Sequence, residues 1–202
     1  MAIAMPSQYV SRLRALLPAF SEYEPDLVRL INVKSFEECT RNEVRYKILT
    51  LIARGISTAT AIANNIGIGR TAIYRHLNIM ERTGFIVHHN NRYYIAARFF
   101  LVYDVSIDSD GSIRINVFSD RGGFVDGELG FVLVKGPYCK CEVCDLYERC
   151  LTAVKKLAKK LDVVVRSEHP LQAFKEIVTV IAQRDVINLI RRGYLVVKME
   201  TA

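Results

Sequence analysis

Four cysteines in the second half of the chain are spaced closely enough to bind one metal centre. The spacing C-x-C-x2-C-x5-C is formed by Cys139, Cys141, Cys144 and Cys150. Four thiolates can surround a Zn²⁺ ion in the closed tetrahedron of a structural site, and the same ligands suit an iron–sulfur cluster. We therefore predict a metal site at these residues, with zinc as the first assignment and an iron–sulfur cluster as the alternative. Disulfides, for example between Cys141 and Cys144, are the competing interpretation.

A basic helix is predicted directly after these cysteines, and its positive charge would help to hold four thiolates. Its lysines are Lys155, Lys156, Lys159 and Lys160. The fifth cysteine, Cys39, stands alone and is interpreted as a small buried apolar side chain. The histidines follow no metal-ligand pattern such as H-E-x-x-H, and a site closed by four cysteines leaves no open position for Lewis-acid chemistry. We predict that the protein is not an enzyme.

The net positive charge of the chain comes from one stretch, residues 41–98. This stretch holds nine basic and two acidic side chains, so its net charge equals the formal +7 of the whole protein. The other residues hold 19 basic and 19 acidic side chains, which cancel. A local basic surface on a compact unit indicates a polyanionic partner such as nucleic acid.

The hydrophobic pattern of this stretch predicts three helices followed by a hairpin. The helices are expected at Asn42–Arg54, from an N-cap at Thr58 or Thr60 to Asn65, and at Arg70–Thr83. Gly67 is expected to adopt a positive φ in the turn between the second and third helices. Strands at residues 85–87 and 92–95 would flank a polar turn at residues 88–91.

The third helix is expected to present a polar face that suits the major groove of DNA. Arginine can make two hydrogen bonds to guanine, and threonine and tyrosine can reach bases or phosphates. The hairpin tip could lie along the DNA backbone or in the minor groove. The predicted DNA-binding residues are five outward side chains of the helix and two at the hairpin tip: Arg70, Thr71, Tyr74, Arg75, Asn78, Asn91 and Arg92.

The stretch resembles the winged helix-turn-helix of the ArsR and MarR classes of prokaryotic transcription regulators. The resemblance covers about 60 of the 202 residues and is carried by Ala63, Gly67, residues 73–77 and residues 84–86. It implies that Thr71, Tyr74 and Arg75 face DNA and that Arg92 belongs to the wing. Tyr74 stands where those families often carry a small hydroxyl residue.

Residues 1–40 are predicted to form two helices, one within Ser7–Phe20 and one that starts near Pro25. They either pair two copies of the chain or pack on their own domain. The N-terminus lacks the apolar core and cleavage site of a signal peptide, and no apolar run approaches the roughly 18 residues that cross a bilayer. We expect a cytoplasmic protein that does not enter a membrane.

Residues 99–202 are predicted to form an α+β domain with a small antiparallel sheet, helices and the four-cysteine site. Strands are expected at 99–107, 112–118, 129–134, 162–165 and 194–199, a loop at Arg121–Gly123, and a long helix from Pro170 to Gly193. The fold class is α+β, and the predicted domains are residues 1–40, 41–98 and 99–202.

The sequence therefore predicts a sequence-specific DNA-binding transcription regulator that is stabilised by metal or responds to metal or redox state. Its partners would be double-stranded DNA and a second copy of the chain, because one winged helix reads few base pairs. The alternative is a general transcription or assembly factor that uses the winged helix and a zinc knuckle to bind protein.

Overall fold

The computed structural model describes residues 23–191, so the helix predicted within Ser7–Phe20 and the strand predicted at 194–199 lie outside the described residues. The helical group consists of α2 (Val33–Thr40), α3 (Glu43–Ala53), α4 (Ala59–Ile66) and α5 (Arg70–Arg82), with the hairpin of β2 (Ile86–His89) and β3 (Arg92–Ile95). The rest consists of β1 (Asp26–Asn32), β4 (Ala97–Ile107), β5 (Ile113–Asp126), β6 (Gly130–Lys135), α6 (Tyr147–Lys160) and α7 (Pro170–Arg191). The α+β class is confirmed.

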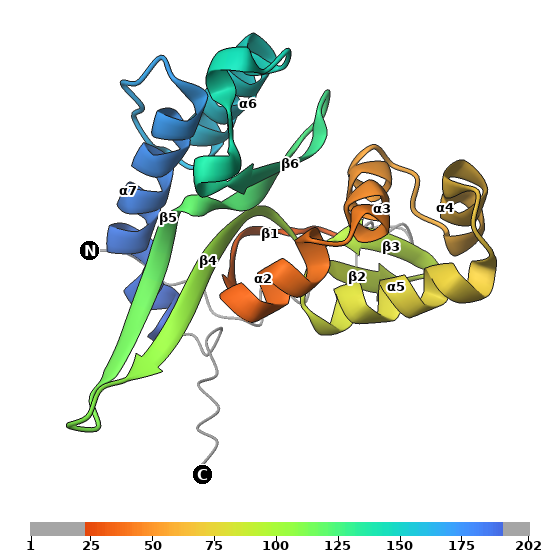
Figure 1. Ribbon diagram of the computed structural model, residues 1–202, viewed down its shortest axis with the longest axis horizontal. Coiled ribbons are helices and arrows are strands. Elements are labelled where there is room, and N and C mark those ends of the chain that lie inside the picture. Colours follow the sequence, from red (N-terminus) through yellow and green to blue (C-terminus); the bar gives the residue numbers. More distant parts are fainter. Residues whose placement is uncertain (1–22, 192–202) are drawn as a thin grey trace, which may run out of the picture.

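The molecule is elongated, with the two groups of elements at opposite ends. Figure 1 shows α3, α4, α5 and the β2–β3 hairpin at one end, and α6 and α7 at the other. The four-stranded sheet has the order β1-β4-β5-β6. Strands β4, β5 and β6 are antiparallel as predicted, whereas β1 is parallel to β4, which makes the sheet mixed.

The three helices of the basic stretch form as predicted, and the first two begin at a side chain that caps the helix. The Asn42 side chain accepts a hydrogen bond from the Arg45 amide at 3.1 Å, and the Thr58 hydroxyl accepts one from the Ala61 amide at 3.3 Å. Gly67 has a φ of 78° and closes α4, in agreement with the expected turn.

The hairpin of β2 and β3 has a tighter turn than predicted. His89 pairs with Arg92, so only Asn90 and Asn91 remain in the turn. Their φ angles of 48° and 62° are the left-handed pair that a two-residue type I′ turn requires. Asparagine tolerates this conformation better than most residues, which explains the sequence at the tip.

Residues 26–32 form a strand, so the prediction of a helix starting near Pro25 was wrong. Val28 and Leu30 pack towards α6 and α7, while Ile31 packs towards the helical group. This alternation has the period of a strand, and β1 gains its hydrogen bonds from β4, a partner about 70 residues away in the chain. The apolar run alone does not distinguish the two structures.

Two further predictions in the second half were wrong. Arg121–Gly123 lies within β5 rather than in a loop, because β4 and β6 pair with it on both sides. Residues 162–165 form no strand: Val163 and Val165 pack inward and Val164 is exposed, yet no neighbouring strand pairs with them. The hairpin of β4 and β5 and the start of α7 at Pro170 agree with the sequence.

Residues 99–102 of β4 are buried on both faces of the strand and separate two hydrophobic cores. Phe100 and Val102 belong to the core beneath the helical group, which we call the helix-turn-helix core. Phe99 and Leu101 belong to the core beneath α6 and α7, which we call the C-terminal core. The domain border predicted at residue 98 therefore falls inside a strand that contributes to both cores.

Candidate nucleic-acid interface and cysteine cluster

Helix α5 has one fully buried side and one polar side. Ile73, Leu77 and Met80 are completely buried in the helix-turn-helix core, as their spacing predicts. The predicted DNA-binding residues of this helix are all exposed: Arg70, Thr71, Tyr74, Arg75 and Asn78. Tyr74 has 47 % of its surface exposed, so an aromatic ring is available on this face. Gly69 precedes the helix, and no side chain caps its first amides.

The hairpin presents the other two predicted residues. Asn91 and Arg92 are both exposed at the turn between β2 and β3. Behind the turn, His88 stacks on Tyr93 with ring centroids 4.5 Å apart, and the Tyr93 amide donates to the Ser57 carbonyl at 2.7 Å. These contacts hold the hairpin against the start of α4.

Some basic residues of the stretch form ion pairs with carboxylates, and others do not. Those next to α2 are occupied: Arg82 pairs with Glu38 at 2.8 Å, and Arg41 pairs with Glu37 at 3.1 Å. Arg70, Arg75 and Arg92 make no ion pair with any carboxylate whose side chain the structure describes. Arg70, Arg75 and Arg92 therefore place unpaired positive charge on the outward face of α5 and at the hairpin tip.

His76 lies on the flank of α5 and was not singled out from the sequence. Its Nδ1 is buried without a hydrogen-bond partner within the described residues. Burial lowers the pKa of the imidazole, and the positive charge of Arg45 lowers it further. His76 is therefore an uncharged neighbour of the basic face.

The hairpin is joined directly to the sheet. Ala96 alone separates β3 from β4, and its amide donates to the Phe85 carbonyl at 2.8 Å. Its carbonyl accepts a hydrogen bond from the Asp26 amide at 3.0 Å, at the start of β1. The Arg29 guanidinium donates to the Gly84 carbonyl at 3.0 Å, where α5 gives way to β2. A displacement of the sheet would therefore be transmitted to the hairpin and to the end of α5.

The four clustered cysteines lie between β6 and α6. Two short 3-10 turns, η1 (Gly136–Tyr138) and η2 (Cys141–Val143), place the first three, and Cys150 lies in α6. Cys144 is exposed and the other three are half-buried. The Lys135 amide donates to the Cys139 sulfur at 3.2 Å. No disulfide joins any of the five cysteines, all of which are described.

The thiols of this cluster influence one another. The pKa of Cys150 is raised to about 11, mainly by burial and also by the neighbouring Cys141, Cys144 and Cys139. Burial also raises the pKa of Cys141, although a hydrogen bond from the Leu171 backbone opposes the change. Within residues 23–191, however, no three His, Cys, Asp or Glu side chains are gathered as ligands of one metal ion. The metal site stays a prediction.

The cluster packs beside the segment that leads into α7, which the sequence did not indicate. Glu142 lies 3.6 Å from the His169 ring, and the Tyr147 hydroxyl donates to the Glu168 carbonyl at 3.0 Å. Two of the four lysines expected to support the thiolates have other partners: Lys155 pairs with Glu168, and Lys156 pairs with Glu128. Cys39 is fully buried, as predicted, and burial raises its pKa to about 12.

The comparisons with known proteins agree with the geometry of the helical group. Residues 42–87, which run from the cap of α3 into β2, match the family described as "Bacterial regulatory protein, arsR family". This supports an ArsR-type helix-turn-helix, the DNA-binding unit of a class of transcription regulators. No curated protein matches the chain. Among the described residues, no helix is long and apolar enough to span a membrane.

Proposed function

We propose that the protein is a sequence-specific transcription regulator that binds double-stranded DNA. The observation that carries the proposal is the outward face of α5, where exposed polar and basic side chains lie on a helix matched by the ArsR family. A helix of this kind enters the major groove with its N-terminal residues near the bases. Arg70 and Arg75 make no ion pair with a carboxylate among the described side chains, so both guanidinium groups can bind guanine or phosphate.

The hairpin acts as the wing in this proposal. Asn91 and Arg92 are exposed at a rigid type I′ turn, so they can contact the sugar–phosphate backbone beside the groove that α5 occupies. One α5 reads only a few base pairs, and two copies of the chain on a pair of half-sites would supply the specificity that a regulator needs. We therefore propose a homodimer on DNA.

The experiment selects duplexes from a random pool with the full chain and measures the affinity for the enriched sequence. Arg75→Ala is expected to weaken binding by about ten-fold to one hundred-fold, since a good arginine–guanine pair contributes roughly 1–3 kcal/mol. Lys159→Ala removes one exposed positive charge from α6 and serves as the control, with affinity expected to stay within about two-fold. Enrichment of no sequence, together with binding to another protein, would favour an interaction module instead.

We also propose that the cysteine cluster binds zinc, with an iron–sulfur cluster as the alternative. Support comes from the mutual influence of the four thiols and from the amides that donate to Cys139 and Cys141, since hydrogen bonds to ligating sulfurs are common at such centres. Binding would require the loop that carries Cys139 to Cys144 to close on Cys150. The metal would then stabilise the loop or report metal or redox state.

Protein purified without oxygen distinguishes these possibilities by elemental analysis and visible absorbance. Zinc predicts a colourless protein with about one bound ion per chain, and an iron–sulfur cluster predicts a brown one. Cys144→Ser is expected to lower the metal content, whereas Cys39→Ala, outside the cluster, should leave it unchanged. Protein that stays free of metal after zinc addition would rule out the site.

A further inference from the structure

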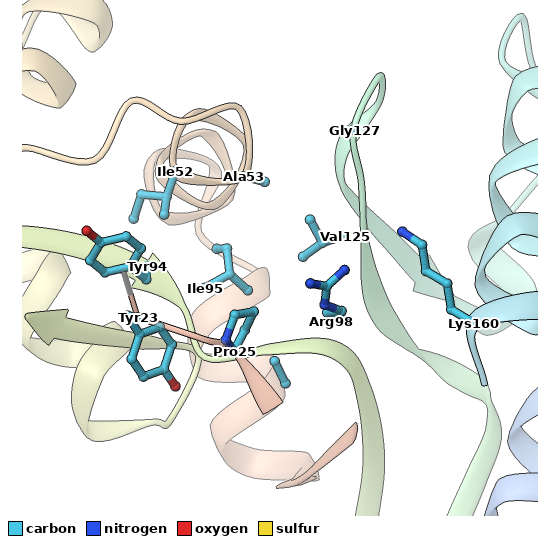
Figure 2. A pocket seen from close by; sticks show the side chains of 11 residues that line it. Tyr23, Pro25, Ile52, Ala53, Tyr94, Ile95, Arg98, Val125, Gly127 and Lys160 are labelled. Carbon is cyan, nitrogen blue, oxygen red and sulfur yellow. The ribbon is translucent and has the colours of Figure 1, made fainter. Parts of the chain in front are cut away.

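A cavity lies where the helix-turn-helix meets the sheet and α6. Its volume is about 300 Å³, at the lower end of the roughly 300–1,000 Å³ found for small-molecule sites. Five separate parts of the chain line it: the segment before β1, the end of α3, the strand β3 with the start of β4, the end of β5 with the β5–β6 turn, and the last residue of α6. Figure 2 shows these walls around a central space.

One side of the cavity is positively charged. Arg98 and Lys160 line it, and Figure 2 shows the charged ends of both side chains near the β5–β6 turn. No aspartate or glutamate is among the lining residues. Neither cation makes an ion pair with a carboxylate in the part of the chain that the structure describes. An anion in the cavity would therefore meet two cations and no carboxylate among the lining residues.

The opposite side is apolar and aromatic. Tyr23 and Tyr94 lie with their ring centroids 5.6 Å apart, and Ile52 lies beside them in the cavity wall (Figure 2). The Tyr23 hydroxyl donates to the Ala96 carbonyl at 3.3 Å, which directs the polar end of this ring to the backbone and leaves the ring itself as wall. Such a surface favours the flat or apolar body of a ligand.

We propose that this cavity binds a small organic anion whose acidic group contacts Arg98 and Lys160 and whose aromatic or apolar body packs on Tyr23 and Tyr94. A simple inorganic anion would leave the aromatic wall unused, and a neutral apolar compound would leave two cations without a partner. Because the lining has a positively charged side and an apolar side, it favours a ligand that has both an acidic group and an aromatic or apolar body.

The position of the cavity gives the bound anion a regulatory role, which rests on the proposed DNA-binding function. Tyr94 belongs to the wing strand β3, Ile52 to α3, and Lys160 to α6. A ligand that contacts all three favours the arrangement of wing and sheet in which these contacts are made. Ligand binding therefore shifts the protein towards this arrangement. The affinity of the wing and α5 for DNA changes by a factor that is set by how much more tightly the ligand binds this arrangement than the others.

The test measures binding of benzoate and phenylphosphate to the full-length protein without DNA, by calorimetry or by ligand-observed NMR. Benzamide, which has the same shape as benzoate and no charge, is the matched ligand control. We expect saturable binding of at least one of the two anions, and at least about ten-fold weaker binding of benzamide. Inorganic phosphate, which has charge without an aromatic body, should also bind at least about ten-fold more weakly than phenylphosphate.

Arg98→Gln and Lys160→Gln should each weaken anion binding by about ten-fold, because each removes one charged hydrogen-bond donor. Lys159→Gln is the control, since Lys159 precedes Lys160 on α6 and does not line the cavity. Saturable binding of neither anion, or binding that Arg98→Gln and Lys160→Gln leave unchanged, would overturn the proposal. Because this measurement contains no DNA, a failure of the DNA-binding proposal would leave its outcome unaffected.

Discussion

Gly122 and Gly123 in β5 allow phenylalanine rings to lie directly against the sheet. A Cβ atom at Gly123 would lie 2.5 Å from Cζ of Phe131, and one at Gly122 would lie 2.9 Å from Cζ of Phe174. Phe131 belongs to the helix-turn-helix core and Phe174 to the C-terminal core. The two glycines therefore serve the packing of both cores.

The close approach of Phe131 to Gly123 leaves no space for a larger residue at position 123. Gly123→Ala should lower the free energy of unfolding by about 1–3 kcal/mol, because Phe131 is buried and packs against Phe85 and Phe100, and has no room to move. Gly127→Ala is the control, since a Cβ there would meet no atom within 4 Å. Urea unfolding followed by circular dichroism measures both variants. Equal stability of the two variants would contradict the packing described here.

His76 shows how burial and a neighbouring arginine affect the protonation of a side chain. Its lowered pKa means that the folded protein binds a proton at this site less readily than the unfolded chain does. Stability should therefore fall as the pH drops through the unfolded pKa of about 6.5, and His76→Gln should reduce this dependence. Urea unfolding at pH 7.5 and 5.5 measures the difference. An identical loss of stability in wild type and variant would show that His76 has no part in it.

The helices of the basic stretch depend on local signals at their ends. Thr58→Ala should destabilise the protein by about 1 kcal/mol, since its hydroxyl accepts the only side-chain capping bond at the start of α4. Thr60 was an equal candidate from the sequence, but its side chain is exposed and makes no such bond, so Thr60→Ala is the control. Thermal unfolding of both variants decides between them. A larger loss for Thr60→Ala would reverse the assignment of the cap.

The elements that could be predicted are those whose signals are local. Caps, a turn glycine and a helical apolar period lie within a few residues of one another, so α3, α4 and α5 and their exposed side chains follow from the sequence. The predicted outward positions of α5, Asn91 and Arg92 are all exposed. Their contacts with DNA stay a prediction.

The elements that could not be predicted depend on distant partners. Strand β1 exists through its pairing with β4, and residues 162–165 have the alternation of a strand without a strand beside them. The cavity between α3, β3 and α6 combines residues from Tyr23 to Lys160, and no sequence spacing indicates it. Likewise, the packing of Glu168 to Leu171 beside the cysteines arises from the fold alone.

At the scale of the whole molecule, the sheet connects the helical group with α6 and α7. The alternate side chains of β4 belong to two cores, and β4 continues from the wing strand β3 after a single residue. The cysteine cluster, α6 and the cavity thus lie on one continuous path to the wing. Coupling along this path requires that both ends favour the same arrangement of the sheet.

The net positive charge lies in residues 41–98, so DNA binding through this stretch should depend on salt concentration. The most direct test is the affinity of the full chain for its selected duplex between 50 and 200 mM KCl. If these basic residues bind phosphates, the logarithm of the affinity falls linearly with the logarithm of the salt concentration, with a slope of about −0.9 for each phosphate contacted. Arg92→Ala should reduce the magnitude of the slope by about 1, and Lys159→Ala should leave it unchanged. Affinity that does not change with salt, or no binding to any duplex, would contradict DNA binding through this stretch.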